Sequence, residues 1–279
     1  MRRPYSKARM LILGLLAGLA GPVPAQQVLA ADAPPVFSTT PETAWVGIGI
    51  GAFLPVAGSP KPVGQDPAYR YIPNGTPGQQ PTQRISDIGN PNLKQWAKDV
   101  MKKDNDDILY HGKIQFTANS SCLPAGVPVF DLLPGPHFVV QTPKQVIFLE
   151  EQGQQVRHIY LDVPHSANVK PSWYGESVGH YEGDTLVADT IGVSTKTVVD
   201  SYRTPHTEKL HIVERWRLID GGNGLEVNIT VDDPDTFVQP WQTYQRYQRS
   251  NQPLGEFICQ ENNSNLFDYH MPTAEHPDF

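Results

Sequence analysis

The residue types best suited to proton transfer are concentrated between residues 204 and 216. Two imidazoles and two carboxylates occur there: His206, Glu208, His211 and Glu214. Imidazole titrates near neutral pH, and a nearby carboxylate can fix its tautomer and orientation. This segment is therefore a candidate for general acid–base chemistry, with purely structural or surface histidines as the alternative interpretation.

Glu214 is of particular interest because of the face on which it lies. If residues 209–218 form a strand, the neighbours of Glu214 on its face are apolar, and His211 lies on the opposite face. A buried carboxylate is costly unless it is paired or used. We therefore expect Glu214 to act in catalysis or, alternatively, to pair with an arginine of a neighbouring strand, such as Arg157 or Arg246.

Two more acid–base candidates lie outside this segment. His165 follows another predicted strand, in a loop of the kind that places residues at the mouth of a barrel. Asp189 alternates with Thr185, Val187 and Ile191, so it is an acidic side chain on a mainly apolar face. It could orient a catalytic histidine. An aspartate that only bonds backbone groups at a strand end is the alternative.

Aromatic residues near these candidates could contact a ligand. Trp173 and Tyr174 lie in a Pro-Ser-Trp-Tyr-Gly run, and Tyr202 precedes Pro205. We expect these three side chains to form an aromatic rim around a ligand or, alternatively, to plug the end of a barrel.

No cofactor is predicted. The histidines and carboxylates named above could hold a zinc-like ion with a water in the open position, but no HExxH or comparable spacing supports a metal. No GxSxG elbow marks a serine nucleophile either. Elimination, isomerisation or hydration by proton transfer is therefore favoured over hydrolysis through a covalent serine intermediate.

The composition limits what can surround these residues. Of the 279 residues, 39% are hydrophobic and 18% charged, which suits a packed core and argues against a disordered chain. The 27 prolines and 23 glycines favour many turns and short elements over long helices. With a formal charge of -7 the chain has no general basic footprint, so we expect no sequence-independent nucleic-acid binding.

From about residue 137 the apolar residues recur with a period of two. Eight short runs rich in Val, Ile, Tyr, Phe, Thr and Trp are separated by turn signals: residues 137–141, 145–151, 156–162, 177–181, 185–193, 209–219, 225–232 and 241–250. Sequential hairpins predict a mainly β fold, an antiparallel meander closed into a barrel or a strongly curved half-barrel, because closure removes exposed edges. A two-sheet β-sandwich is the alternative.

One amphipathic helix is predicted before these strands. Asn90-Pro91 is typical of a helix start, and apolar residues then recur at intervals of three and four. We expect the helix to end near Lys103, before the Asp104-Asn105-Asp106-Asp107 run. Upstream, residues 45–53 alternate glycine with apolar residues, which suits a strand that another backbone approaches closely.

The first 25 residues are predicted to be a signal peptide. Arg2, Arg3, Lys7 and Arg9 precede a short apolar run, and small residues follow at 23–25. That run is too short to span a bilayer as a helix. We therefore expect a bacterial protein of the periplasm or the medium, whose mature form has no integral membrane span. The partial twin-arginine motif leaves the export route open.

The predicted organisation has four parts. They are a signal peptide (1–25), a Pro/Gly-rich extension (26–91), a β-barrel domain with a leading helix (92–265) and a C-terminal strap (266–279). Cys122 and Cys259 are the only cysteines, and an exported chain with an even count usually pairs them. A catalytic or metal-bound pair is less favoured because neither cysteine belongs to a CxxC motif.

Three segments resemble a family of exported bacterial proteins to which no activity is assigned. They read PSWYGESVGHYEGDTLVADT at 171–190, PHTEKLHIVER at 205–215, and DP to PW at 233–241. The resemblance covers roughly residues 120–265 and implies no catalytic assignment. At the level of fold alone, the predicted barrel is similar to the lipocalin-like calycins, an analogy that says little about chemistry.

These features predict an exported, soluble β-barrel protein that binds a small, partly apolar molecule. In an enzymatic version it would be a lyase, isomerase or hydrolase whose histidines and carboxylates converge within about 3–5 Å in an open pocket. A non-catalytic periplasmic carrier would instead have a deeper, mainly apolar cavity. An envelope interaction module would present an exposed apolar patch.

Overall fold

The computed structural model describes residues 34–49, 51–73, 75–113, 117–133, 135–151 and 155–259. The predicted signal peptide and the predicted C-terminal strap lie outside these residues. No helix in the described part of the chain is long and apolar enough to cross a membrane.

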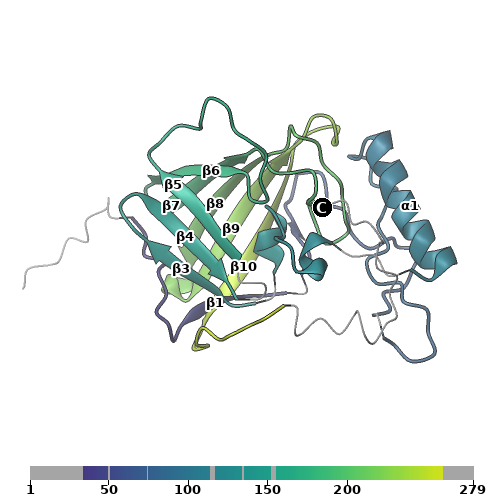
Figure 1. Cartoon of the computed structure of the whole chain (residues 1–279), viewed down its shortest axis with the longest axis horizontal. Coiled ribbons are helices and arrows are strands. Elements are labelled where there is room, and N and C mark those ends of the chain that lie inside the picture. Colours follow the sequence, from purple (N-terminus) through teal and green to yellow (C-terminus); the bar gives the residue numbers. More distant parts are fainter. Residues whose placement is uncertain are drawn as a thin grey trace, which may run out of the picture. The chain divides into compact units, whose positions relative to one another are not determined.

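Nine strands close into a barrel, which confirms the predicted fold class (Figure 1). They are β1 (Ala44–Gly47), β3 (His137–Gln141), β4 (Gln145–Glu150), β5 (Gln155–Leu161), β6 (Glu176–Glu182), β7 (Thr185–Ile191), β8 (His211–Ile219), β9 (Gly224–Asp232) and β10 (Trp241–Ser250). Neighbours in this order pair with each other, and β1 pairs with β10 to complete the circle. A tenth strand, β2 (Leu54–Pro55), also pairs with β10. The bounds of the eight predicted strands are correct to within two residues.

The prediction of a purely antiparallel meander is wrong at one place. Strands β5 and β6 are parallel and pair only through Tyr160 with Val178 and Leu161 with Gly179. A parallel pair needs a long crossover to return the chain to the same end of the sheet, and residues 162–175 supply it. We call the β5–β6 junction the seam.

Part of the Pro/Gly-rich extension belongs to the barrel wall. Strand β1 pairs with β10 over Ala44–Gly47 and meets β3 where Trp45 pairs with His137. The strand expected over residues 45–53 therefore forms only as far as Gly47. The close backbone approach expected at its glycines is not seen at Gly47 or Gly49, because a Cβ at Gly47 would first meet side chains at 3.9 Å and one at Gly49 would meet nothing within 4 Å. Without β1, β3 and β10 would be the two open edges of the sheet.

The interior of the barrel is a packed core. Alternation along each strand turns one face inward, and aromatic rings from different strands meet there: Phe148 of β4 lies 4.8 Å from Trp216 of β8, which lies 5.8 Å from Tyr247 of β10. All three rings are buried. The interior is filled by side chains at these positions, as in other small barrels.

Helix α1 (Gln95–His111) is longer than predicted. The acidic run does not end it, because Lys102 with Asp106 and Lys103 with Asp107 form ion pairs one turn apart. The helix ends instead at Gly112, which adopts the left-handed conformation (φ 63°) that favours glycine. Asn90 does not cap the helix. Its side chain accepts the backbone N–H of Asn92 in a turn that precedes it.

The expected disulfide is present. Cys122 and Cys259 are bonded across a sequence separation of 137 residues, and the bond ties the segment before β3 to the segment after β10. The chain-entropy account assigns a loop of this length up to about 5 kcal/mol of stabilisation.

Removing this bond should lower the free energy of unfolding. We expect the double variant Cys122→Ser/Cys259→Ser to lose about 2–5 kcal/mol, because its unfolded chain regains the entropy of the open loop. Urea unfolding of the wild type with and without reductant provides the comparison. The reduced wild type should match the double variant, and equal stability of the oxidised and reduced protein would contradict the prediction.

Candidate functional site

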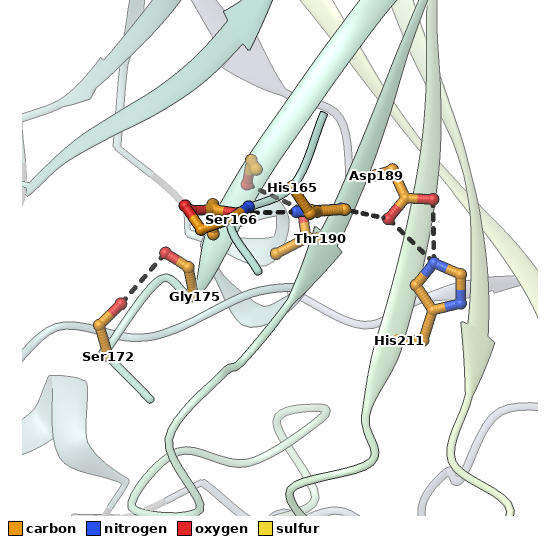
Figure 2. Close-up of polar contacts among 9 residues, drawn as sticks. His165, Ser166, Ser172, Gly175, Asp189, Thr190 and His211 are labelled. Atoms are coloured by element: carbon orange, nitrogen blue, oxygen red, sulfur yellow. Dashed lines mark hydrogen bonds and ion pairs between the residues drawn. The ribbon is translucent and has the colours of Figure 1, made fainter. Parts of the chain in front are cut away.

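Three of the predicted acid–base residues meet on one side of the barrel (Figure 2). Asp189 of β7 lies between His165 in the crossover and His211 at the start of β8. Its Oδ1 is 2.9 Å from His165 Nε2 and 3.0 Å from His211 Nε2. The other ring nitrogen of His165, Nδ1, is 3.0 Å from Oε1 of Glu176, the first residue of β6. We call Glu176, His165, Asp189 and His211 the outer-wall network.

The network lies on the outside of the barrel, whereas the sequence suggested the mouth or lining. Leu186, Ala188 and Thr190 of β7 are fully buried and point into the barrel. Asp189 lies between Ala188 and Thr190 in the sequence, so its side chain points outward. Its side chain is 38% exposed, and that of His211 is 41% exposed. The alternation predicted for β8 is confirmed, since His211 and Glu214 occupy opposite faces.

Glu176 is the member of the network that the sequence analysis missed. Its carboxylate also accepts the backbone N–H of Ser166 at 2.7 Å and the Ser166 hydroxyl at 2.6 Å. These hydrogen bonds, followed by the one from His165, hold the pKa of Glu176 below its usual value. The only available signal was an acidic residue at the start of a strand after a long loop, which does not identify a partner.

Carboxylates and imidazoles alternate along the network. Burial raises the pKa of Asp189, but the hydrogen bonds from His165 and His211 outweigh it, and the pKa lies below its usual value. The donor and acceptor roles of the two ring nitrogens of His165 depend on its tautomer, so each nitrogen can either donate to the carboxylate oxygen beside it or accept a proton from it. The resulting order of carboxylate, imidazole, carboxylate, imidazole can pass a proton along hydrogen bonds that already exist.

A pocket of about 580 Å³ opens at the seam, where β5 and β6 diverge. Its lining combines aromatic, hydroxyl and charged side chains: Pro124, Val156, His158, Tyr160, Ser166, Asn168, Val169, Lys170, Ser172, Trp173, Tyr174, Gly175, Glu176 and Ser177. We call it the seam pocket. Glu176 thus belongs both to the pocket lining and to the outer-wall network.

Tyr174 lines the pocket, and a hydrogen bond from its hydroxyl fixes the orientation of its side chain. Its hydroxyl donates to Oε1 of Gln155, which also accepts the backbone N–H of Ala125 at 2.9 Å. The amide nitrogen of Gln155 donates to Asn119 at 2.8 Å. Burial, with the nearby charge of Glu150, keeps the pKa of Tyr174 well above its usual value, so its hydroxyl stays protonated. Tyr202, the third predicted aromatic, does not line this pocket.

Glu214 is placed inside the barrel, away from the network. It is fully buried, and its carboxylate accepts two hydrogen bonds from Arg157, one of them at 2.7 Å. The predicted alternative, an ion pair with Arg157, is therefore the one observed. Asp131 lies 3.9 Å from the same guanidinium. Burial and the neighbouring Glu214 raise the pKa of Asp131, which favours its neutral form. We call Asp131, Arg157 and Glu214 the interior cluster.

Arg157 also bridges the seam from inside. Its second amino group lies 3.3 Å from the hydroxyls of Ser177 on β6 and Thr190 on β7, and these hydroxyls are 2.8 Å apart. In the part of the chain that the structure describes, no backbone pairing joins β5 and β6 at the level of Arg157. The two paired positions of these strands, Tyr160 with Val178 and Leu161 with Gly179, lie farther toward the C-terminal ends of the strands. Side-chain hydrogen bonds therefore replace backbone ones across the gap.

His206 and Glu208 do not join either group. His206 is buried, with Nε2 2.9 Å from the Thr197 hydroxyl and Nδ1 2.9 Å from the Thr207 carbonyl. Burial lowers its pKa, so it is a neutral structural residue at pH 7. Glu208 is exposed to solvent in the loop before β8.

Breaking the interior ion pair should be more costly than removing it. In Arg157→Met, Glu214 stays buried without its partner, and we expect a loss of about 3–5 kcal/mol in the free energy of unfolding. The double variant Arg157→Met/Glu214→Leu removes both charges and should recover most of that loss. Urea unfolding at pH 7 measures both. A double variant as unstable as the single one would show that the unpaired charge of Glu214 is not the cause of the lost stability.

The outer-wall carboxylates, Glu176 and Asp189, should make the folded protein less stable as the pH falls. Their pKa values are lowered in the folded state, so their contribution is fully present above the ordinary carboxyl pKa and is lost as the pH falls through the lowered value. The melting temperature of the wild type should therefore fall more steeply between about pH 5 and pH 3 than that of Asp189→Asn. The exposed Asp162 provides a control, because Asp162→Asn should keep the wild-type slope. Identical slopes for all three proteins would exclude this linkage.

Among the described residues, no group of three or more His, Cys, Asp or Glu is arranged to hold a metal ion. No protein-family model matches the chain, and no curated protein matches it. The function is therefore inferred from the geometry of the site.

Proposed function

We propose that this protein binds a small, partly apolar molecule in the seam pocket and exchanges a proton with it through the outer-wall network. The observation that carries this proposal is the position of Glu176. It lines the pocket, and His165, Asp189 and His211 extend from it along the outer wall by contacts of 2.9–3.0 Å. A ligand in the pocket therefore lies next to one end of a ready-made proton path.

The hydrogen-bond inventory of Glu176 supports contact with a donor on the ligand. Oε1 already has two partners, the Ser166 backbone N–H and Nδ1 of His165, while Oε2 accepts, within the described part of the chain, from the Ser166 hydroxyl alone. A carboxylate oxygen has two acceptor sites, so Oε2 retains capacity for one more donor. A hydroxyl or amine on the ligand suits that capacity.

The network accounts for where the proton goes. A proton taken up by Glu176 can move to Nδ1 of His165 when that imidazole carries its single proton on Nε2. The Nε2 proton then passes to Asp189 Oδ1, which transfers it to Nε2 of His211 when that ring carries its own proton on Nδ1. His211 is partly exposed, so its Nδ1 proton can be released to water. Each step breaks one N–H or O–H bond and forms another, and the reverse sequence delivers a proton to the ligand.

A non-catalytic carrier is the second candidate, and one observation favours it. The lowered pKa of Glu176 makes it a weak base near neutral pH, which suits holding a hydrogen-bond donor better than removing a proton. In this alternative the network fixes the crossover and orients the ligand without chemical change.

We also infer that the protein is exported. A disulfide between Cys122 and Cys259 persists in oxidising compartments. The predicted signal peptide at residues 1–25 agrees with that location.

Ligand screening in D₂O separates the two candidates. Thermal-shift screening with aromatic, terpenoid, lipid and sugar compounds, with and without EDTA and divalent metals, identifies binders of the wild type. Saturating ligand raises stability by about 2.7 kcal/mol at a hundredfold excess over Kd. NMR of each binder in D₂O then shows whether deuterium enters a C–H position. Proton transfer predicts exchange that His165→Gln abolishes while the thermal shift persists.

The exposed His180 provides the matched control. Its replacement in His180→Gln should change neither binding nor exchange. Binding without exchange in the wild type would favour the carrier, and the absence of any binder would contradict both candidates.

A further inference from the structure

The side chains that line the seam pocket suggest the class of its ligand. From these we infer, on the basis of the proposed function, that the pocket takes a neutral saccharide. A sugar ring has a flat C–H face that packs on aromatic rings, and its hydroxyls both donate and accept hydrogen bonds. A site for such a molecule needs exposed aromatic surface next to polar groups of mixed type, with little net charge.

The aromatic surface comes from β5 and the crossover. Tyr160 and His158 point outward from β5, and their rings lie nearly parallel, at 11° with centroids 6.0 Å apart. Tyr160 is 47% exposed although it lines a pocket. Trp173 of the crossover also lines the pocket. Neighbouring aromatic rings that stay accessible in a pocket offer a ligand a flat apolar surface on which to pack.

The polar groups are of several kinds. Glu176 is an acceptor with spare capacity, Ser166 and Ser172 carry hydroxyls, and Asn168 carries an amide. The hydroxyls of Ser166 and Ser172 already donate to Glu176 and to the Gly175 carbonyl. A sugar can use the acceptor sites that remain on these oxygens together with the Asn168 amide, whereas a terpenoid or an acyl chain would use none of them. The chemistry of the lining therefore favours a hydroxyl-rich ligand over a lipid.

The charge of the lining favours a neutral ligand. Glu176 and Lys170 are the carboxylate and the ammonium in the lining, and their charges balance. A phosphate or carboxylate ligand would call for an excess of Arg or Lys. The volume of about 580 Å³ lies within the usual range of small-molecule sites, about 300–1,000 Å³.

Calorimetry with defined sugars tests this inference. The probes are cellobiose, maltose and N,N′-diacetylchitobiose, with 4-methylphenol and cyclohexanol as ring alcohols that lack the multiple hydroxyls. We expect the wild type to bind at least one disaccharide more tightly than either ring alcohol. Tyr160→Ala and Trp173→Ala should each weaken that binding about tenfold, since they remove stacking surface.

Two further variants guard against misfolding and nonspecific effects. Tyr160→Phe keeps the ring and should bind within about threefold of the wild type. Tyr110→Ala removes an aromatic ring that is 71% exposed on α1 and is not part of the pocket lining, so it should bind as the wild type does. Melting curves establish that each variant is folded.

The outcomes separate this inference from the proposed function. Binding of a ring alcohol but of no sugar, with the same dependence on Tyr160 and Trp173, would overturn the saccharide and leave the pocket as the binding site. Sugar binding unchanged in Tyr160→Ala and Trp173→Ala would overturn this pocket as the sugar site. If none of the five probes binds the folded wild type, the saccharide inference falls, while the proposed function stands or falls on the wider screen.

Discussion

The parallel pairing of β5 with β6 is the constraint on which the rest of the site depends. A parallel neighbour cannot be reached by a hairpin, so residues 162–175 must travel back along the barrel before β6 begins. This crossover carries His165, Ser166 and Trp173. The two strands pair at only two positions, and the seam pocket opens beside this short ladder. The crossover required by the parallel topology thus brings its side chains to the gap.

A gap in a barrel wall would expose strand edges unless other interactions close it. Arg157 closes it from inside, because it joins Ser177 of β6, Thr190 of β7 and Glu214 of β8 to its own strand. The desolvation of a buried guanidinium is costly, and the paired carboxylate offsets that cost. Glu176 joins the crossover to β6 from outside through its hydrogen bonds to Ser166 and His165. The seam is therefore held together by side chains on both faces.

The sequence predicted the strands, the barrel and the disulfide because each depends on a local or pairwise pattern. The period of two located eight strands. The acidic residue on an apolar strand face left two interpretations of Glu214, a catalytic role or a pair with an arginine such as Arg157, and the pair is observed. The parallel seam could not be predicted, since nothing local distinguishes a long hairpin loop from a crossover. Asp189 was ambiguous for another reason. Both faces of β7 carry apolar residues, so only the neighbouring strands decide which face points inward. The length of α1 was underestimated because the acidic run was expected to end the helix. That expectation overlooked the lysines one turn earlier, which form ion pairs with Asp106 and Asp107.

The register of β6 against β7 keeps the interior cluster and the outer-wall network on opposite faces of the barrel wall. Ser177 pairs with Thr190 on the inward face, while the next pair, Val178 with Asp189, faces outward. A slip of one residue would exchange these faces and place Asp189 in the core, so the register must be strongly specified. Gly179 contributes to that specification. A Cβ at this position would lie 2.6 Å from the Val187 carbonyl oxygen and 2.9 Å from Ile159 of β5. Only glycine at position 179 lets β5 and β7 approach β6 this closely. The register that separates the buried ion pair from the outer-wall network is therefore specified beside the seam, where β5 and β6 pair at only two positions.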